Sequence, residues 1–242
     1  MKILKASTLI TQDKILKEMA IAFEKTILDI DTLENLEKKY PDAEVEILPD
    51  NSLLMPGLIN AHVHLEFSAN KTDLKYGSFM PWLHSVIAQR EELVSECDDA
   101  CIAATLEGIL NSGTTTIGAI SSHGYDLNAA AASPLNVIFF NELIGSQALM
   151  ADALYSDFLN RLESSQQTKR DGFIPAIAIH SPYSVHPILI KRAVEYAKKY
   201  QLPLSAHFME SLAERQWCEE NEGEFKAFFK EFLKQDYSVN TP

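Results

Sequence analysis

The pattern of apolar and polar positions changes character near residue 58. From there to the end, short apolar runs alternate with amphipathic stretches that repeat with a helical period. Strands are expected at 58–65, 114–120, 135–141, 173–180 and 203–208. Helices are expected at 97–111, 149–166, 187–199 and 225–233. This β/α alternation predicts a parallel sheet with right-handed connections.

The first 55 residues have a different pattern, in which short strand-like runs surround one charged helix. Strands are expected at 6–10, 19–23 and 44–48, and a helix at 32–39. We therefore expect two domains, one over 1–55 and one over 56–242.

Two histidines, His62 and His64, lie within the first apolar run after Pro56-Gly57. The run 58–65 is apolar enough to predict a buried strand. Because side chains alternate along a strand, both imidazoles point to the same face. Two neutral imidazoles on one face can begin a transition-metal site. The alternative is a pair of hydrogen-bonded core histidines.

Other polar residues also fall where predicted strands end. His180 ends the fourth strand and His207 ends the fifth, so four of the seven histidines lie at carboxyl ends of strands. In a β/α barrel, these ends carry the active site. His180 could therefore contact or polarise a substrate, and the alternative is a structural histidine. His84, His123 and His186 have no partner spacing, so we interpret them as structural or surface residues.

Glu210 follows His207 by three residues, so one segment could supply a metal ligand and a proton carrier to the same pocket. The alternative is a carboxylate that stabilises a helix N-terminus. Cys97 and Cys101 are four residues apart in a helical stretch and could share a metal. The other interpretation is a pair of partly buried free thiols.

Composition and charge narrow the possible functions. The chain has 242 residues, 46% of them hydrophobic, which can fill a sizeable core. Its net charge of −13 argues against a nucleic-acid partner. We recognise neither a signal peptide nor an apolar run near the roughly 20 residues of a membrane helix. An odd set of three cysteines argues against disulfides. These features predict a cytoplasmic protein without a membrane partner.

Several motifs together resemble the amidohydrolase superfamily. The segment Met55-Pro56-Gly57-Leu58-Ile59-Asn60-Ala61-His62-Val63-His64 resembles the opening barrel strand of that superfamily. The similarity continues through 81–83, 112–115, 180–183 and 205–210. The branch that the chain resembles contains purine and nucleoside aminohydrolases and the chlorohydrolases.

The resemblance implies an α/β fold, with a metal-dependent (β/α)8 TIM barrel and a small β-sandwich built from both chain ends. It implies that His62, His64 and His207 bind one divalent metal, zinc or else iron. In the same pattern, Glu210 is catalytic and moves protons at a ring nitrogen, and both Glu210 and His180 contact the substrate. Glu91, nine residues after Trp82, matches the place of a ribose-binding glutamate.

The activity implied is hydrolytic deamination of an adenine-type nucleoside. Segments 60–68, 76–79 and 207–212 are most similar to the aminodeoxyfutalosine deaminases of the futalosine route to menaquinone. The alternatives are deaminases of methylthioadenosine, adenosylhomocysteine or guanine, and chlorohydrolases. Arginines that hold the carboxylate of adenosylhomocysteine are missing between Arg90 and Arg161, which argues against that substrate. An alternative of another class is a non-catalytic folding or interaction module.

The family pattern also has a histidine after the sixth strand and a metal-binding aspartate after the eighth. Here the pattern stops at Pro242, so we expect a barrel truncated after about strand 5, with the N-terminal part of the sandwich. Such an arc has open strand edges. We expect the chain alone to be inactive and to associate as a homo-oligomer.

Overall fold

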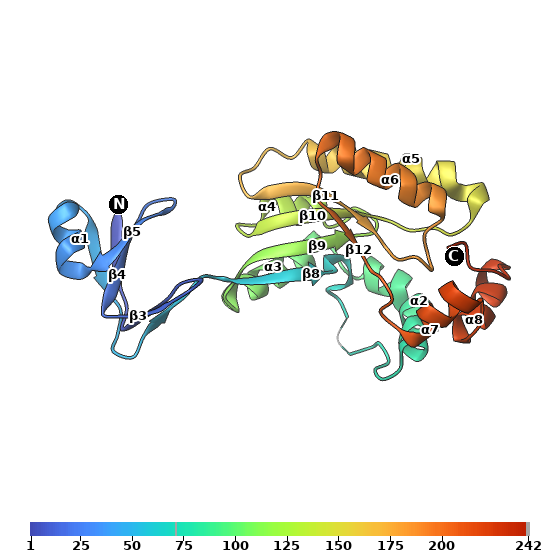
Figure 1. Ribbon diagram of the computed structural model, residues 1–242, viewed down its shortest axis with the longest axis horizontal. Coiled ribbons are helices and arrows are strands. Elements are labelled where there is room, and N and C mark those ends of the chain that lie inside the picture. Colours follow the sequence, from blue (N-terminus) through green and yellow to red (C-terminus); the bar gives the residue numbers. More distant parts are fainter. Residues whose placement is uncertain (71, 241–242) are drawn as a thin grey trace. The chain divides into compact units, whose positions relative to one another are not determined.

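The computed structural model describes residues 1–70 and 72–240. Its contacts divide the chain into two compact units, one spanning Met1–Gly57 and the other beginning at Leu58 (Figure 1). No helix in these described ranges is long and apolar enough to cross a membrane.

The first unit contains two small sheets and one helix. One sheet has the order β5-β4-β1-β6, built from Ile27–Thr32, Met19–Phe23, Lys2–Lys5 and Glu44–Ile47. The other has the order β3-β2-β7, built from Ile15–Lys17, Thr8–Ile10 and Leu53–Leu54. Helix α1, Leu33–Lys39, buries Leu36 against Ile3 and Ala20. Thr32 caps this helix by accepting a hydrogen bond from the Asn35 backbone N–H.

The second unit is built on a five-stranded parallel sheet whose spatial order, β12-β11-β10-β9-β8, follows the chain (Figure 1). The strands are β8 Leu58–Val63, β9 Thr114–Ser121, β10 Asn136–Leu143, β11 Phe173–Ile179 and β12 Leu204–Ala206. The helices are α2 Phe79–Ser95, α3 Asp99–Asn111, α4 Leu127–Ala132, α5 Ala151–Gln166, α6 Pro187–Tyr200, α7 Leu212–Glu220 and α8 Glu224–Leu233. Short 3-10 turns are η1 Leu65–Phe67 and η2 Ala148–Met150.

Helices cover one face of this sheet, so the strand side chains that do not contact a helix lie on the opposite face. Val137 and Phe139 of β10 pack with Ile102 and Leu106 of α3 in one core cluster. A second cluster joins Ile177 and Ile179 of β11 to side chains of α5 and α6. Since strand side chains alternate, Glu142 of β10 and Ala178 of β11 face the opposite side, which is the interior side of a barrel.

Strand β8 departs from the sequence expectation. We predicted a buried strand over 58–65, but it ends at Val63, and Leu58 and Ile59 are 51% and 71% exposed. Within the described residues β8 is hydrogen-bonded only to β9, so it is an edge strand and its apolar side chains lack a second covering neighbour. Strand β12 is also shorter than predicted, so His207 lies just beyond its end.

A β-bulge shapes the end of β8. Asn60 pairs with Ile117 and Val63 with Ala119, so β8 carries one extra residue between them. The Asn60 side chain accepts a hydrogen bond from the backbone N–H of His62 at 3.2 Å. Gly118 of β9 makes room for the bulge, because a β-carbon there would overlap the Ala61 carbonyl. The bulge therefore sets the direction of the first histidine.

Candidate metal and active site

Four histidine rings converge where β8, β11 and β12 end. The Nε2 atoms of His62 and His64 lie 3.2 Å apart. The His207 ring centroid is 4.9 Å from that of His62 and 5.5 Å from that of His180. The structure thus brings together the three histidines predicted as metal ligands and the one predicted to contact substrate.

Two donor atoms of this cluster have a spacing that suits a zinc ion. Two imidazole nitrogens bound to one tetrahedral zinc at about 2.0–2.1 Å would be separated by about 3.3–3.4 Å, close to the spacing of His62 and His64. A direct hydrogen bond between the two rings would have the same length. Within residues 1–70 and 72–240, no three or more His, Cys, Asp or Glu side chains already surround a common point. The His207 ring adjoins this pair, with its centroid 4.9 Å from that of His62.

Partial or full burial favours the neutral form of three of these imidazoles. It lowers the pKa of His62, lowers that of His64 to about 4 and lowers that of His180 to about 3, with smaller contributions from neighbouring histidines. An imidazole must be unprotonated to bind a metal. The Nδ1 atom of His64 is buried and has no hydrogen-bond partner among the described residues. The lowered pKa values of His62, His64 and His180 thus favour the protonation state that metal binding requires.

Glu210 lies beside the cluster, with Oε2 3.8 Å from Nδ1 of His207. Its side chain is 33% exposed, and its partial burial raises its pKa while His207 opposes the shift. The helix that follows is capped by Ser211, and Glu214 accepts a hydrogen bond from the Glu210 backbone N–H. Glu210 therefore precedes the helix rather than stabilising its first turn. Met209 has φ 52°, a left-handed conformation that is strained for this residue.

His180 is held by two contacts. Its Nδ1 atom lies 2.6 Å from the Ser184 hydroxyl, and its backbone N–H donates to the Leu143 carbonyl at 3.1 Å. The backbone N–H of His207 in turn donates to the His180 carbonyl at 2.9 Å. These main-chain bonds fix the two rings side by side at the sheet edge.

No hydrogen bond or ion pair joins Glu91 to the four histidines in the part of the chain that the structure describes. This glutamate lies on α2 with an exposed side chain that forms no hydrogen bond or ion pair within the described part of the chain. Trp82, on the same helix, packs against Phe79 with ring centroids 5.4 Å apart.

The remaining candidates have structural roles. The Sγ atoms of Cys97 and Cys101 are 3.5 Å apart, Cys97 donates to the Leu65 carbonyl, and burial raises the pKa of Cys97. They are packed thiols. His186 caps α6, while His84 and His123 contact the aromatic rings of Phe228 and Tyr125.

Two buried carboxylates near the site were not predicted from the sequence. Glu66 is 1% exposed and accepts hydrogen bonds from the backbone N–H groups of Ser122, His123 and Tyr125 at 2.8, 2.9 and 3.1 Å. Glu142 is 2% exposed and accepts one from the Ser122 hydroxyl. Burial raises the pKa of Glu142 to about 7. Glu142 ends a strand like the histidines do, and that position was the available signal.

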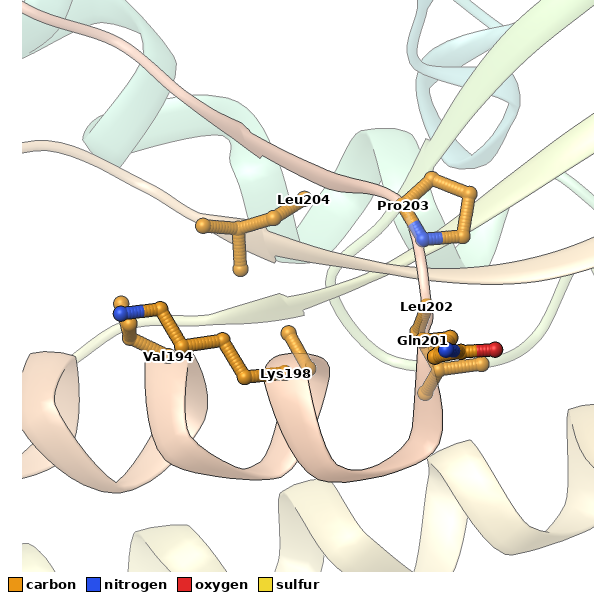
Figure 2. A pocket seen from close by; sticks show the side chains of 7 residues that line it. Val194, Lys198, Gln201, Leu202, Pro203 and Leu204 are labelled. Carbon is orange, nitrogen blue, oxygen red and sulfur yellow. The ribbon is translucent and has the colours of Figure 1, made fainter.

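A larger pocket, of about 500 Å³, lies at the other end of the sheet. Its lining comes from the end of α6 and the start of β12: Val194, Ala197, Lys198, Gln201, Leu202, Pro203 and Leu204 (Figure 2). It has a single ionisable side chain and contains none of the histidines. In β/α barrels the amino-terminal ends of the strands serve stability, so this pocket is not the candidate active site.

Comparison with known proteins agrees with this geometry. The amidohydrolase family model matches residues 53–236. The aminodeoxyfutalosine deaminase of a Nitratiruptor species is 55% identical over 240 residues, which are 99% of this chain and 59% of that protein. A crystal structure of Helicobacter pylori aminofutalosine deaminase in complex with methylthio-coformycin has a TM-score of 0.90 at 33% identity, over 99% of this chain and 58% of that one.

An adenosine deaminase from Xanthomonas campestris with bound zinc shares the fold, with a TM-score of 0.73 at 19% identity over 96% of this chain and 52% of that one. The chain thus spans 52–59% of the length of these relatives. The expected α/β fold, with part of a (β/α)8 barrel joined to smaller β elements, is confirmed. The chain belongs to the amidohydrolase family.

Proposed function

We propose that this protein is a hydrolytic deaminase of an adenine-type nucleoside, with 6-amino-6-deoxyfutalosine as the substrate. The observation that carries the proposal is the convergence of His62, His64 and His207 beside Glu210, in a chain 55% identical to an aminodeoxyfutalosine deaminase. The proposed setting is menaquinone biosynthesis in the cytoplasm.

The metal-binding residues of the proposal are His62, His64 and His207. Amidohydrolases generally bind a divalent metal, and we assign zinc, with iron as the alternative. When bound, such an ion lowers the pKa of water so that hydroxide is available at neutral pH. The neutral rings and the Nε2 spacing of His62 and His64 support this assignment.

Glu210 is the proposed proton carrier. It would donate a proton to the ring nitrogen adjacent to the carbon that bears the amine, so that ammonia can leave and a carbonyl remains. A carboxyl group suits this role when its pKa lies closer to the operating pH, and burial raises the pKa of Glu210 in that direction. The distance of 3.8 Å between its Oε2 atom and Nδ1 of His207 supports this role.

Two further residues are proposed to bind the substrate. His180 is neutral, because burial lowers its pKa to about 3, and its ring adjoins His207. It can therefore form a hydrogen bond to the substrate without adding charge. Glu91 is proposed to bind the sugar hydroxyls, and its support is the sequence position nine residues after Trp82.

The test uses two proteins, because the chain spans 59% of the length of the Nitratiruptor deaminase. One is the chain of 242 residues alone. The other is a fusion of this chain to the carboxyl-terminal segment of that deaminase which it does not match. Both are loaded with zinc and assayed for ammonia release from aminodeoxyfutalosine, adenosine, methylthioadenosine, adenosylhomocysteine and guanine, and for chloride release from a chlorinated ring.

We expect the fusion to have the highest kcat/KM with aminodeoxyfutalosine, and the chain alone to be inactive. If the fusion binds zinc but has a higher kcat/KM with guanine or the chlorinated ring, the proposed substrate is wrong. A fusion that binds zinc and releases no ammonia from any compound would contradict the proposed activity.

A further inference from the structure

Glu142 lies on the barrel side of the sheet, next to the histidine cluster. It pairs in register with Ala178 of β11, and His180 lies two residues after Ala178. Because side chains alternate along a strand, Ala178 and His180 project from the same face. Glu142 therefore projects from the same face of the sheet as His180, and it is 2% exposed.

Only one of the two carboxylate oxygens of Glu142 has a hydrogen-bond partner among the described residues. Its Oε2 atom accepts a hydrogen bond from the Ser122 hydroxyl at 2.5 Å. Its Oε1 atom is buried and has no hydrogen-bond partner among residues 1–70 and 72–240. A buried polar atom without a partner costs about 1–3 kcal/mol, and more when it is charged. A group outside the chain would remove this cost.

A small cavity adjoins this carboxylate. Its volume is about 10 Å³, and its lining includes His62, Glu142, Ala178, Ser205 and His207. This is about the smallest space that holds one water molecule, and a nucleobase could not enter it. Carboxylate, imidazole and hydroxyl groups supply the two or more polar partners that a buried water needs.

We propose that Glu142 holds one water molecule in this cavity and through it orients the His62 and His207 rings for metal binding. His62 directs Nε2 toward His64, which leaves Nδ1 to donate a hydrogen bond. Metal-binding histidines usually donate their second ring N–H to a carboxylate, carbonyl or water, and this fixes the ring orientation. Glu142 is thus a positioning residue, and the inference rests on the proposed metal role of these histidines.

The test measures zinc affinity of the 242-residue chain by competition with a chromophoric chelator, without any nucleoside. Glu142→Leu removes the acceptor and should weaken zinc binding 10- to 100-fold. Glu142→Gln keeps an acceptor oxygen and should stay within about threefold. Ala178→Val fills the cavity but leaves Glu142 in place, and it should weaken binding about tenfold. The Ala178→Val variant keeps the test decisive if Glu142→Leu fails to fold.

The matched control is Asp126→Asn. Asp126 is also a buried carboxylate bonded to a serine hydroxyl, but it does not line the cavity. Its variant should bind zinc within about twofold of the unsubstituted chain. The visible spectrum of the cobalt-loaded protein should change in Glu142→Leu and stay unchanged in Asp126→Asn, because only the first alters the orientation of a ligand.

Equal zinc affinity in the unsubstituted chain, Glu142→Leu and Ala178→Val would overturn the inference. So would a failure of the unsubstituted chain to bind zinc. Loss of affinity in both cavity variants, together with an inactive fusion protein, would support the positioning role while refuting the deaminase assignment. The two proposals therefore fail separately.

Discussion

Gly118 lies directly beneath the carbonyl oxygen of Ala61, so that any β-carbon at position 118 would overlap it. This contact lies between β9 and the bulge of β8, and Ala61 is the residue immediately before His62. The position of His62 therefore requires a residue without a side chain at position 118 of the neighbouring strand.

We expect Gly118→Ala to destabilise the protein by about 1–3 kcal/mol, because backbone atoms must shift to accept the methyl group. Zinc affinity should fall as well, since the shift moves His62. Denaturant unfolding and chelator competition measure the two effects. The control is Gly108→Ala in α3, where a β-carbon meets nothing within 4 Å. That variant should be more stable by about 0.5–1 kcal/mol, and equal behaviour of the two variants would contradict the argument.

His62→Ala and Glu210→Gln should separate metal binding from catalysis. The first removes a proposed ligand and should reduce zinc affinity of the chain by at least about 100-fold. The second keeps the shape of the side chain but cannot carry a proton, so the fusion protein should bind zinc normally and lose about 10²–10⁴ in kcat. Near-normal turnover by Glu210→Gln would show that the proton comes from another group.

Glu91→Gln should raise KM of the fusion protein for the nucleoside about tenfold and leave kcat nearly unchanged. A hydrogen bond from a charged group to a sugar hydroxyl that is equal in the ground and transition states affects binding alone. Glu92→Gln is the control, because Glu92 is the exposed neighbour on the same helix. If both variants have the KM of the unsubstituted fusion, the assignment of Glu91 to the sugar is wrong.

Asp126 should make the folded state less stable as the pH rises. Burial raises its pKa to about 7, Glu66 adds to this shift, and the Ser121 hydroxyl and Arg161 oppose it. The unfolded value is about 3.9, so the folded chain binds the proton more tightly, and its stability falls between about pH 4 and pH 7. Glu142, also raised to about 7, contributes with the same sign.

Asp126→Asn should therefore flatten this pH dependence without abolishing it, and should stabilise the protein at pH 8 by about 1–3 kcal/mol. Urea unfolding midpoints from pH 4 to pH 8 measure the effect. Parallel curves for the two proteins would mean that Asp126 is ionised in the folded state with an ordinary pKa.

Exposed apolar side chains on β8 should promote association of the chain. Ile59 is 71% exposed on a strand whose second edge has no partner among the described residues. Ile59→Lys should shift the size-exclusion profile toward monomer, because a charge on an edge strand opposes pairing with another copy. Leu149→Lys is the control, since Leu149 is 99% exposed on η2 and away from a strand edge. An unsubstituted chain that is a monodisperse monomer would contradict this expectation.

The sequence by itself determined the features that depend on neighbours along the chain. The β/α alternation from Leu58 onward is confirmed, and the boundaries of the predicted elements agree within two residues. Helices α2, α4 and α7 were not predicted. The proximity of His62, His64, His180 and His207 followed from two local rules. Side chains on a strand repeat every second residue, and parallel strands end at the same edge of a sheet.

Tertiary structure decided what depends on contacts between distant segments. Burial of a strand depends on how many neighbours cover it, and so the apolar run at β8 is an exposed edge rather than a core strand. The bulge at His62 depends on Gly118, and Ser122 donates hydrogen bonds to the buried carboxylates of both Glu66 and Glu142. Local periodicity predicts the face of a helix or strand on which a side chain lies. The residues that this side chain contacts depend on how the helices and strands pack together.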